Sequence, residues 1–503
     1  MVNFFSVPPI RDFAEPINAD YKVFVNQEEC PVYNARSSAV PYNGYNDVGV
    51  AFQRPRNQSE TAALVRMEAD EPLRFVVEFP DRPADCPSSV LTGIRRTFRT
   101  PAAVRPLEKK ISVRESGNRA EFCIAEPGAY VFEPYGRHCA LHIFVDAPRR
   151  DGEESYTYFF GAGIHFPGVV RLQSGDSVYI ANGAVVYGSL LAHGAENVRI
   201  CGGGILDGSY EVRIAPHCYE DYTKGNIRLY NCKNVSVEGI MLRDSANWCF
   251  SMYECENISV CNVKIVGQWR YNTDGIDLMN CRRISVENCF VRSFDDSVCL
   301  KATEGFEGNV TDISVKNCTI WCDWGRALEV GLETACEEMA RIVFEGCCII
   351  HSSAVALDIQ AGNYAKISNV TFRNVSAEFE EGALPERMQT SPAEYDAEGK
   401  EMRPALISVG NYAMIDMDMY RYLFTEEQLA DRRRGVVRDV RFEDIRVYLG
   451  DGVKMPPVFI RSFYKDFPFE RIAVRNVTVN GKRVKSADEL HLLVEGVGDF
   501  ELQ

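Results

Sequence analysis

Three aspartates, Asp274, Asp295 and Asp296, have the type and spacing best suited to acid–base chemistry in this chain. Asp295 and Asp296 follow Asp274 by close to the shortest repeat interval of the surrounding sequence, so we expect all three side by side on neighbouring turns of a coil. Strands in such a coil are about 4.8 Å apart, and like charges that close cannot all ionise at their normal pKa. One acid can stay protonated while another remains a base, as glycoside hydrolysis requires. Taken singly, each aspartate is more typical of a solvated turn than of a catalytic site.

The acids lie within a repeated pattern: a polar residue, an apolar anchor, any residue, and a second apolar residue. The anchors are Val198, Val235, Ile258, Ile284, Ile313, Ile342, Val370, Val440 and Ile472. Five positions after the anchors runs a second apolar column: Ile240, Val263, Cys289, Cys318, Cys347, Val375, Ile445 and Val477. A period of this length with strand-type alternation indicates a solenoid, and the short β-branched unit favours a right-handed parallel β-helix.

The elements that position the acids form an all-β chain with two expected domains. Residues 1–155 contain short alternating segments broken by Pro, Gly and Asn, such as Leu73–Phe79, and predict an N-terminal β-sandwich. Residues 160–503 form the predicted catalytic β-helix. Within it, the long interval between Val370 and Val440 predicts an insertion at 378–435 that forms a loop with a short helix.

The insertion contains a capping box, Thr425-Glu-Glu-Gln428, which predicts the start of that helix. Insertions in solenoids project from one face, which is often the binding face. We expect either a wall or lid of a substrate groove, or a solvated excursion or oligomer contact. A homo-oligomer therefore remains open.

Composition limits the classes of partner. The 503 residues exceed what one core usually supports, and the net charge of −16 argues against nucleic acid, anionic membranes and, more weakly, a polyanionic substrate. The sequence has no apolar run long enough for a transmembrane helix and no recognisable signal peptide at its start, so we expect a cytoplasmic location.

The 18 cysteines follow the repeat rather than a metal-binding spacing. Cys232, Cys255 and Cys281 each precede an anchor by three residues, and no Cys-x-x-Cys occurs. Free cysteine packs as a small hydrophobic residue, so we expect stacked core thiols, no metal site and no cofactor.

Two motifs carry a family resemblance. Asn272-Thr-Asp-Gly-Ile-Asp277 and Asp295-Asp-Ser297, on successive coils, resemble glycoside hydrolase family 28, the polygalacturonases, and its relative family 49, the dextranases and isopullulanases. The resemblance covers roughly 160 to 480, and family 49 also places a β-sandwich before the β-helix. It implies an inverting glycoside hydrolase with Asp274, Asp295 and Asp296 as catalytic residues. We assign Asp296 as the general acid, with Asp274 and Asp295 activating water.

Departures from the polygalacturonase pattern bear on the substrate. Gly325-Arg-Ala327 stands where that family has Gly-His-Gly, and Asp358-Ile-Gln360 where it has the Arg-Ile-Lys that holds the galacturonate carboxylate. An acidic sugar would be repelled by Asp358, so we expect a neutral oligosaccharide or polysaccharide of the α-glucan kind. The candidate substrate-binding residues are Asp277, Lys301, Arg326, Glu329, Asp358, Gln360, Trp269 and Trp324. Trp248, Tyr271 and Trp321 are further candidates for stacking on sugars, although core packing is the commoner role for each aromatic.

Three other functions remain open. The nearest is a polygalacturonase-like hydrolase of pectin oligosaccharides. A second is a β-helix lyase using Ca²⁺ and a basic residue, which the loss of the uronate-binding cations disfavours. The third is a non-catalytic carbohydrate-binding β-helix protein, which would bind glycans without turnover.

Overall fold

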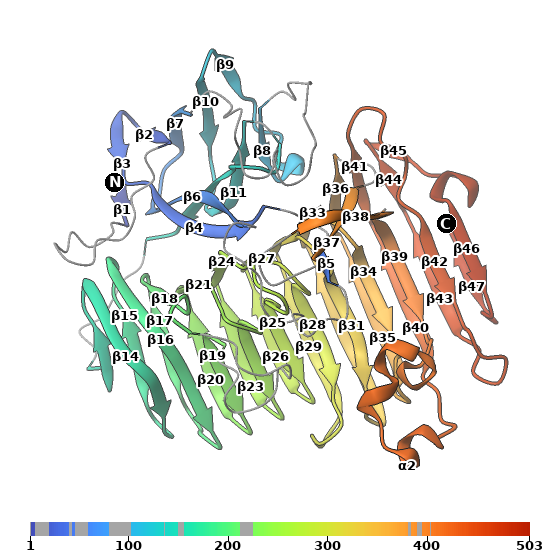
Figure 1. The fold of residues 1–503 in the computed structure, drawn as a ribbon. Helices are drawn as coiled ribbons and strands as arrows, with labels where there is room; N and C mark the ends of the chain where they lie inside the picture. Colours follow the sequence, from blue (N-terminus) through green and yellow to red (C-terminus); the bar gives the residue numbers. More distant parts are fainter. Residues whose placement is uncertain are drawn as a thin grey trace.

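The computed structural model describes residues 2–5, 20–39, 43–45, 59–79, 102–134, 136–148, 155–211, 225–380, 384–389, 395–402 and 404–503. The N-terminal strands form a compact β unit that lies against one side of a long stack of parallel strands (Figure 1). The predicted fold, a β-sandwich followed by a parallel β-helix, is confirmed.

The N-terminal part consists of two sheets with an apolar core between them. One sheet has the order β1-β6-β12-β11-β8, with β4 beside β6, and the other has the order β3-β2-β7-β10-β9. In the described part of these two sheets the strand pairings are antiparallel, except that β6 and β12 pair in parallel. The strands are β1 (Asn3–Phe4), β2 (Lys22–Val25), β3 (Glu28–Cys30), β4 (Tyr33–Ser38), β6 (Ser59–Glu68), β7 (Leu73–Glu78), β8 (Ala103–Arg105), β9 (Arg114–Ser116), β10 (Arg119–Ile124), β11 (Gly128–Glu133) and β12 (Leu141–Asp146).

A 12-stranded parallel sheet forms one side of the β-helix and contains the sequence repeat. Its strands are β13 (Tyr158–Phe160), β15 (Ser177–Ile180), β17 (Arg199–Gly202), β20 (Lys233–Glu238), β23 (Glu256–Cys261), β26 (Arg282–Glu287), β29 (Val310–Lys316), β32 (Glu338–Glu345), β35 (Lys366–Arg373), β40 (Val436–Glu443), β43 (Glu470–Arg475) and β47 (Phe500–Leu502).

The other sides belong to a 21-stranded sheet, which begins with β14 (Gly163–Leu172) and β16 (Ala184–His193) and then divides into two ladders. The first ladder, here called the docking ladder, comprises β18 (Ile205–Asp207), β21 (Met241–Arg243), β24 (Lys264–Val266), β27 (Phe290–Ser293), β30 (Thr319–Cys322), β33 (Cys348–Ser352), β36 (Ser376–Phe379), β41 (Arg446–Leu449), β44 (Thr478–Val479) and β45 (Lys482–Arg483). The second, the site ladder, comprises β19 (Ile227–Tyr230), β22 (Phe250–Tyr253), β25 (Ile276–Met279), β28 (Val298–Ala302), β31 (Arg326–Thr334), β34 (Val355–Gln360), β39 (Ala405–Gly410), β42 (Val458–Arg461) and β46 (Leu492–Glu495).

The register follows the predicted anchors. From Val235 to Ile472, each anchor pairs with the next anchor of the series across neighbouring strands. The polar residue before each anchor has a positive φ, for example 58° at Asn257 and 61° at Asp312. Asn and Asp tolerate this left-handed conformation better than most residues, which explains six of the nine residues at the start of the pattern. The other three are Arg283, Arg341 and Arg471.

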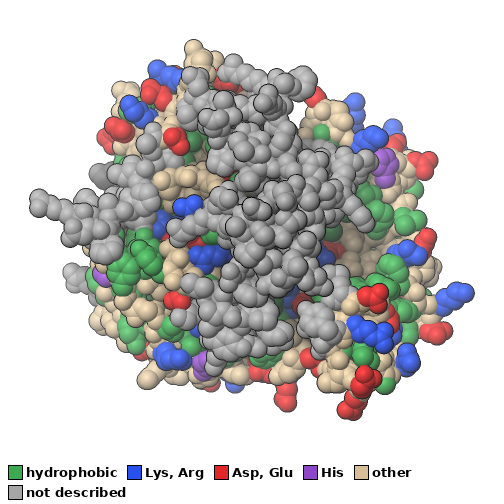
Figure 2. All heavy atoms as spheres, in the orientation of Figure 1, with side chains coloured by type: hydrophobic (Ala, Val, Ile, Leu, Met, Phe, Trp, Pro, Cys, Tyr) green, Lys and Arg blue, Asp and Glu red, His purple; other side chains and the backbone are tan. Residues whose placement is uncertain are grey.

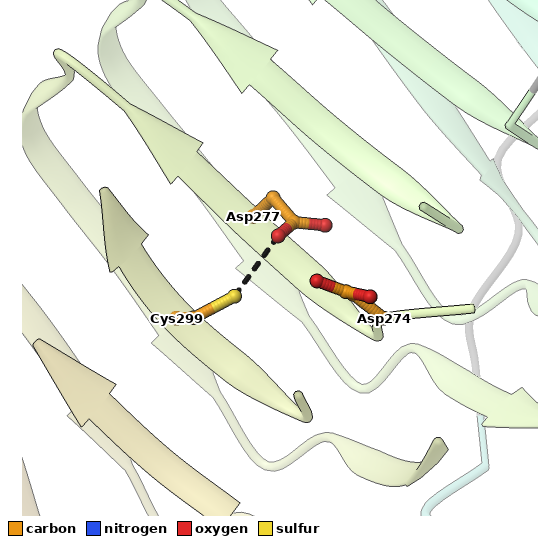
Figure 3. A group of neighbouring side chains, drawn as sticks. All are labelled: Asp274, Asp277 and Cys299. Atoms are coloured by element: carbon orange, nitrogen blue, oxygen red, sulfur yellow. Dashed lines mark hydrogen bonds between the residues drawn. The ribbon is translucent and has the colours of Figure 1, made fainter. Parts of the chain in front are cut away.

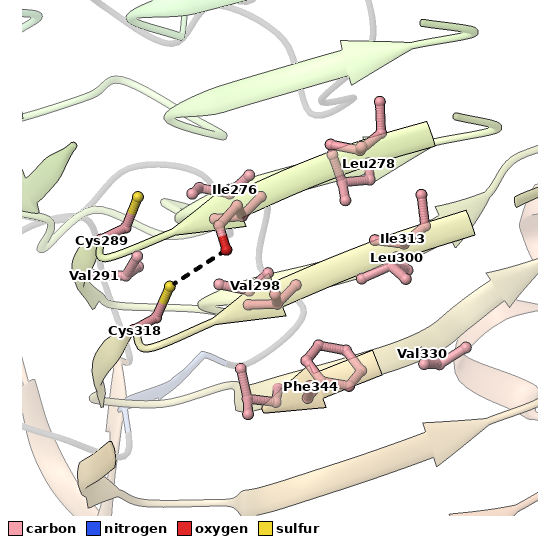
Figure 4. Packing of buried hydrophobic residues seen from close by; sticks show 14 of the residues in the cluster. Ile276, Leu278, Cys289, Val291, Val298, Leu300, Ile313, Cys318, Val330 and Phe344 are labelled. Carbon is pink, nitrogen blue, oxygen red and sulfur yellow. Dashed lines mark hydrogen bonds between the residues drawn. The ribbon is translucent and has the colours of Figure 1, made fainter. Parts of the chain in front are cut away.

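The predicted apolar column lies in the core. Each of its eight members is at most 2% exposed. Figure 4 shows Cys289 and Cys318 stacked beside the strand residues Ile276, Val298 and Leu300. The cysteines of the described residues are free, as the stacked-thiol interpretation predicts.

The predicted insertion is partly regular structure. Its β37 (Leu384–Gln389) and β38 (Tyr395–Met402) form a three-stranded sheet with β5 (Asn43–Tyr45) from the N-terminal part. Contrary to the expectation of a loop with one short helix, β39 lies within 378–435 and pairs with β34 as a strand of the solenoid. The helices here are η3 (Met414–Asp416), η4 (Asp418–Leu423) and α2 (Glu426–Leu429), and Thr425 caps α2 through the predicted capping box.

Residues after 480 add β45, η5 (Asp488–Leu490), β46 and β47 to the end of the stack. The remaining short helix, η2 (Leu107–Lys109), follows β8. None of the helices in the described part of the chain is long and apolar enough to cross a membrane.

The sandwich packs on the docking ladder through a separate apolar cluster. Leu64, Val131 and Phe144 of the sandwich contact residues such as Phe290 and Trp321 of the β-helix. Turns that connect the docking ladder to the site ladder therefore lie next to the sandwich. For example, Arg137 of the sandwich donates to the Ser353 hydroxyl between β33 and β34. Figure 2 shows side chains of both charges interspersed around the rim of the visible face.

Candidate active site

Four neighbouring strands of the site ladder, β25, β28, β31 and β34, carry the predicted polar residues. The strand register aligns Asp277, Cys299, Glu329 and Asp358 in one row. Asp274 precedes β25, and Asp295 and Asp296 lie in the turn between β27 and β28. The structure thus brings together acids from successive coils at the start of these strands.

Two glycines allow the turns to approach one another. The Gly275 N–H donates to the carbonyl of Asp296 at 2.8 Å, and a Cβ at Gly275 would lie 2.3 Å from the Ser297 carbonyl oxygen. A Cβ at Gly325 would lie 2.4 Å from Oδ1 of Asp296, the oxygen that accepts the Arg326 N–H at 2.9 Å. The turn before β31 therefore needs glycine at 325 to hold the Asp296 carboxylate.

Lys301 is the buried cation of the cluster. Its Nζ lies 3.0 Å from Asp274, 3.4 Å from Asp277 and 3.4 Å from Asp296, and its side chain is 4% exposed. The ammonium also lies over the Trp248 ring, 4.5 Å from its centroid. Lys301 therefore supplies positive charge to three carboxyl groups at once.

Arg326 is the more exposed cation. Its guanidinium lies 3.8 Å from Asp296, 3.8 Å from Glu329 and 3.4 Å from Asp358, and 35% of its side chain is exposed. Gln360 donates to Asp358 at 2.9 Å and to the Ser408 hydroxyl at 2.8 Å. Arg326, Glu329, Asp358 and Gln360 therefore form one connected group beside Asp296.

The surroundings of the two adjacent aspartates push their pKa values apart. Burial, and next the charge of Asp296, raise the pKa of Asp295 to about 7. Burial acts in the same direction on Asp296, but Lys301, Arg326 and the Arg326 N–H outweigh it and lower the pKa of that carboxyl. These surroundings favour Asp295 as the proton donor and Asp296 as the base, whereas the resemblance assigns Asp296 as the acid.

The other acids of the cluster favour the protonated form. Burial raises the pKa of Asp274 and of Glu329 well above the usual range, and raises that of Asp277 to about 6. Six carboxyl groups, counting Asp358, face two cations. They cannot all be ionised together in a buried site.

Two groups of side chains are close enough to hold a cation: Asp274, Asp277 and Cys299, and Asp296, Cys299 and Glu329. Figure 3 shows the first, with the Cys299 thiol donating to Asp277 at 2.9 Å. Lys301 already lies beside both aspartates of this group. Its ammonium occupies the electrostatic position that a metal ion would take.

The aromatic candidates separate into covered and half-exposed residues. Contrary to expectation, Trp269 is 3% exposed and its indole N–H donates to Asp244 at 2.9 Å, so its ring is not open to a sugar. Trp321 is fully buried under the sandwich, where Arg292 covers its ring. Trp324 is partly exposed and stacks on Phe294 at 5.4 Å, and it remains a candidate for sugar stacking.

Sequence analysis missed two residues of this region. Cys299 is aligned between Asp277 and Glu329, and strand alternation after the Asp295-Asp-Ser297 motif could have placed it there. Tyr420, in η4 of the insertion, has its pKa raised to about 12, mainly by burial, and the charges of Arg326, Asp295 and Asp296 also act on it. The insertion therefore contributes a side chain on which the charges of the site act, and no spacing in the sequence indicates this.

Comparison with known sequences identifies relatives of the solenoid. Residues 160–380 match the sequence model of Glycosyl hydrolases family 28. A probable polygalacturonase of Arabidopsis thaliana is 26% identical over 197 residues, covering 37% of this chain and 43% of that protein. A probable exopolygalacturonase B of Aspergillus fumigatus is 26% identical over 207 residues, covering 37% of this chain and 44% of that protein. The chain thus spans less than half the length of these curated relatives.

Comparison with solved structures extends over both parts of the chain. Dex49A from Penicillium minioluteum matches with a TM-score of 0.59 and 14% identity, covering 99% of this chain and 96% of that chain. At this identity the likeness shows the fold alone. The sequence match confirms the predicted resemblance to family 28, and the Dex49A match confirms the fold, a β-helix with an N-terminal β part.

Proposed function

We propose that this chain, whose residues 160–380 match the sequence model of Glycosyl hydrolases family 28, is an inverting glycoside hydrolase. The observation that carries the proposal is the pair Asp295 and Asp296, adjacent in a buried turn but with pKa values shifted in opposite directions. Inverting hydrolysis needs one carboxylic acid to protonate the leaving oxygen and one carboxylate to activate water. Near neutral pH, the surroundings of Asp295 favour the protonated acid and those of Asp296 favour the carboxylate.

The roles follow from the contacts. Asp295 is the proposed general acid, because its carboxyl keeps a proton to about pH 7. Asp296, paired with Lys301 and Arg326, is the proposed base. Asp274 lies beside this pair, and its Oδ2 accepts a hydrogen bond from the Lys301 ammonium at 3.0 Å.

The class of sugar is part of the proposal. The relatives include proteins named polygalacturonase, exopolygalacturonase and rhamnogalacturonase, which favours a galacturonide-containing oligosaccharide over the α-glucan expected from the sequence. Arg326 is a partly exposed cation at the site and could pair with a sugar carboxylate. We therefore propose a pectin-type oligosaccharide as the first substrate class.

A neutral glycan is the second candidate, and it rests on Asp358. This carboxyl already shares Arg326 with Glu329 and Asp296, and Gln360 is bound to Asp358. A uronate entering here would compete with three acids for one guanidinium, whereas hydroxyl groups could donate to those acids.

The test is product release from saturated oligogalacturonides, rhamnogalacturonan fragments, and neutral α- and β-glucans. Wild type is compared with Asp295→Asn and Asp296→Asn, and proton NMR records the anomer formed first. We expect turnover with inversion in wild type and a loss of at least about 100-fold in kcat in each variant, the usual range for losing general acid or base catalysis. Retention of configuration would contradict the mechanism, and glycan binding without turnover would indicate a binding protein.

A further inference from the structure

Glu329 is a fully buried acid at the centre of the row on the site ladder. It lies on β31 between Cys299 of β28 and Asp358 of β34, and its side chain is 0% exposed. Neither of its carboxyl oxygens accepts a hydrogen bond from a donor group of the described residues. A buried carboxylate without donors is costly, so the ionised form of Glu329 is poorly supported here.

The nearby charges do not compensate for an ionised Glu329. Arg326 lies 3.8 Å from Glu329, but it is shared with Asp296 at 3.8 Å and Asp358 at 3.4 Å. Lys301 of β28 acts on Glu329 as well, but its closest acids are Asp274, Asp277 and Asp296. Arg326 and Lys301 thus each interact with several acids, and neither neutralises Glu329 alone.

Asp296 and Cys299 are the remaining neighbours of Glu329. Ligand atoms of Asp296, Cys299 and Glu329 all lie within 4.8 Å of one another. The two carboxyl groups therefore lie next to each other, and only a protonated Glu329 could donate a hydrogen bond to the Asp296 carboxylate. Two ionised carboxylates at this separation would repel each other.

We propose that Glu329 is a positioning residue that retains its proton and donates it in a hydrogen bond to Asp296, holding that carboxylate ionised and oriented. The proposal rests on the proposed function of Asp296 as the base. The pKa values agree with the geometry, because burial raises that of Glu329 and a hydrogen bond from Glu329 is among the influences that lower that of Asp296. Glu329 transfers no proton during the reaction and does not touch the water that Asp296 activates.

The kinetic test compares Glu329→Gln with Glu329→Ala. The amide of Gln can donate to Asp296 as the protonated acid does, whereas Ala cannot. We expect Glu329→Gln to keep kcat within about threefold of wild type. The acidic limb of the pH profile of kcat/KM should lie at the same pH as in wild type. Hydrogen bonds to charged groups are worth about 1.5–3 kcal/mol, so in Glu329→Ala that limb should move up by about one to two pH units and kcat should fall at pH 5.

Two kinetic results would overturn the proposal. If Glu329→Gln is as inactive as Asp296→Asn, the site needs Glu329 as a carboxylate. If Glu329→Ala raises only KM and leaves the acidic limb unmoved, Glu329 binds sugar and does not act on Asp296. Thermal unfolding of each variant shows whether the protein remains folded.

A substrate-free measurement separates failure of this proposal from failure of the proposed function. The infrared difference spectrum between wild type and Glu329→Gln at pH 7 should show loss of a carboxylic-acid C=O band. The control is Glu345→Gln, which removes a carboxylate paired with Arg373 on the 12-stranded sheet, and no such band should be lost. Loss of only carboxylate bands in Glu329→Gln would show that Glu329 is ionised, and the proposal would be wrong even if the protein hydrolyses glycans.

Discussion

At the scale of single residues, Asp295 should determine the upper pH limit of activity. Its folded pKa is raised to about 7, so the protonated form needed by a general acid is present below that pH and is lost as the pH rises through it. We expect kcat/KM to fall about tenfold for each pH unit above 7, in a profile that reports the free enzyme. A flat profile from pH 6 to 9 would exclude Asp295 as the acid.

Lys301 should couple the stability of the fold to the charge of the site. Lys301→Met leaves Asp274, Asp277 and Asp296 without their shared ammonium, and losing one partner of a buried ion pair costs about 3–5 kcal/mol. We expect a loss of about 3 kcal/mol in the free energy of unfolding at pH 7, measured with urea. Asp277, with its pKa already raised to about 6, is protonated more fully at pH 5, so the deficit should shrink there.

The control for this prediction is Lys366→Met, because Lys366 is an exposed residue on β35. Its effect should stay within about 0.5 kcal/mol at both pH values. If Lys301→Met lowers the free energy of unfolding by the same amount as Lys366→Met at both pH values, the charge of Lys301 does not stabilise the fold.

Strand alternation and the repeat interval were enough to group Asp274, Asp296, Lys301 and Glu329, because neighbouring coils place equivalent positions side by side. The same reasoning could not tell which aromatic rings are covered. Trp321 and Trp324 are close in sequence, but only Trp321 lies beneath the sandwich. That difference depends on how the two parts dock, which no local pattern records.

At the scale of elements, the conformation of the turn that leads into β31 should require glycine at position 325, because any side chain there would clash with Asp296. Gly325→Ala would bring a Cβ to 2.4 Å from Oδ1 of Asp296 and 2.5 Å from its backbone nitrogen, so the Asp296 turn must shift. We expect kcat to fall at least about tenfold and the fold to lose about 1–3 kcal/mol. The measurements are steady-state kinetics and urea unfolding.

Gly498→Ala is the matched control, because its added Cβ would meet only the Phe469 carbonyl oxygen at 3.6 Å. That variant should keep wild-type kinetics. If Gly325→Ala also does, the close approach of this turn does not position Asp296.

The register of the solenoid was predictable because its anchors combine two physical requirements. An apolar residue must face the core, and the preceding residue must adopt a left-handed conformation that Asn and Asp tolerate. The strand β39 was missed because it interrupts the repeat interval, although Ala405-Leu-Ile-Ser-Val409 has a strand-like apolar composition. Its partner β34 could be identified only from the three-dimensional structure.

At the scale of the whole molecule, Arg105 joins the sandwich to the β-helix. It lies on β8 with no exposed surface and pairs with Glu133 of β11 at 2.7 Å and with Glu378 of β36. His351 of β33 in turn contacts Glu133 at 2.5 Å. Charged residues far apart in sequence therefore meet at this boundary, where spacing gives no indication that they belong together.

Replacing Arg105 should weaken the attachment of the sandwich. Arg105→Met leaves Glu133 of the sandwich and Glu378 of the β-helix buried without their shared guanidinium, which should lower the free energy of unfolding by about 3–5 kcal/mol at pH 7 in urea denaturation. Arg119→Met is the control, because Arg119 pairs with Glu121 on the exposed surface of the same sandwich, and it should cost less than about 1 kcal/mol. Arg105 lies outside the acid cluster, so folded Arg105→Met protein should keep the pH dependence of wild type. A change in that pH dependence would show instead that the position of the sandwich controls the charges of the site.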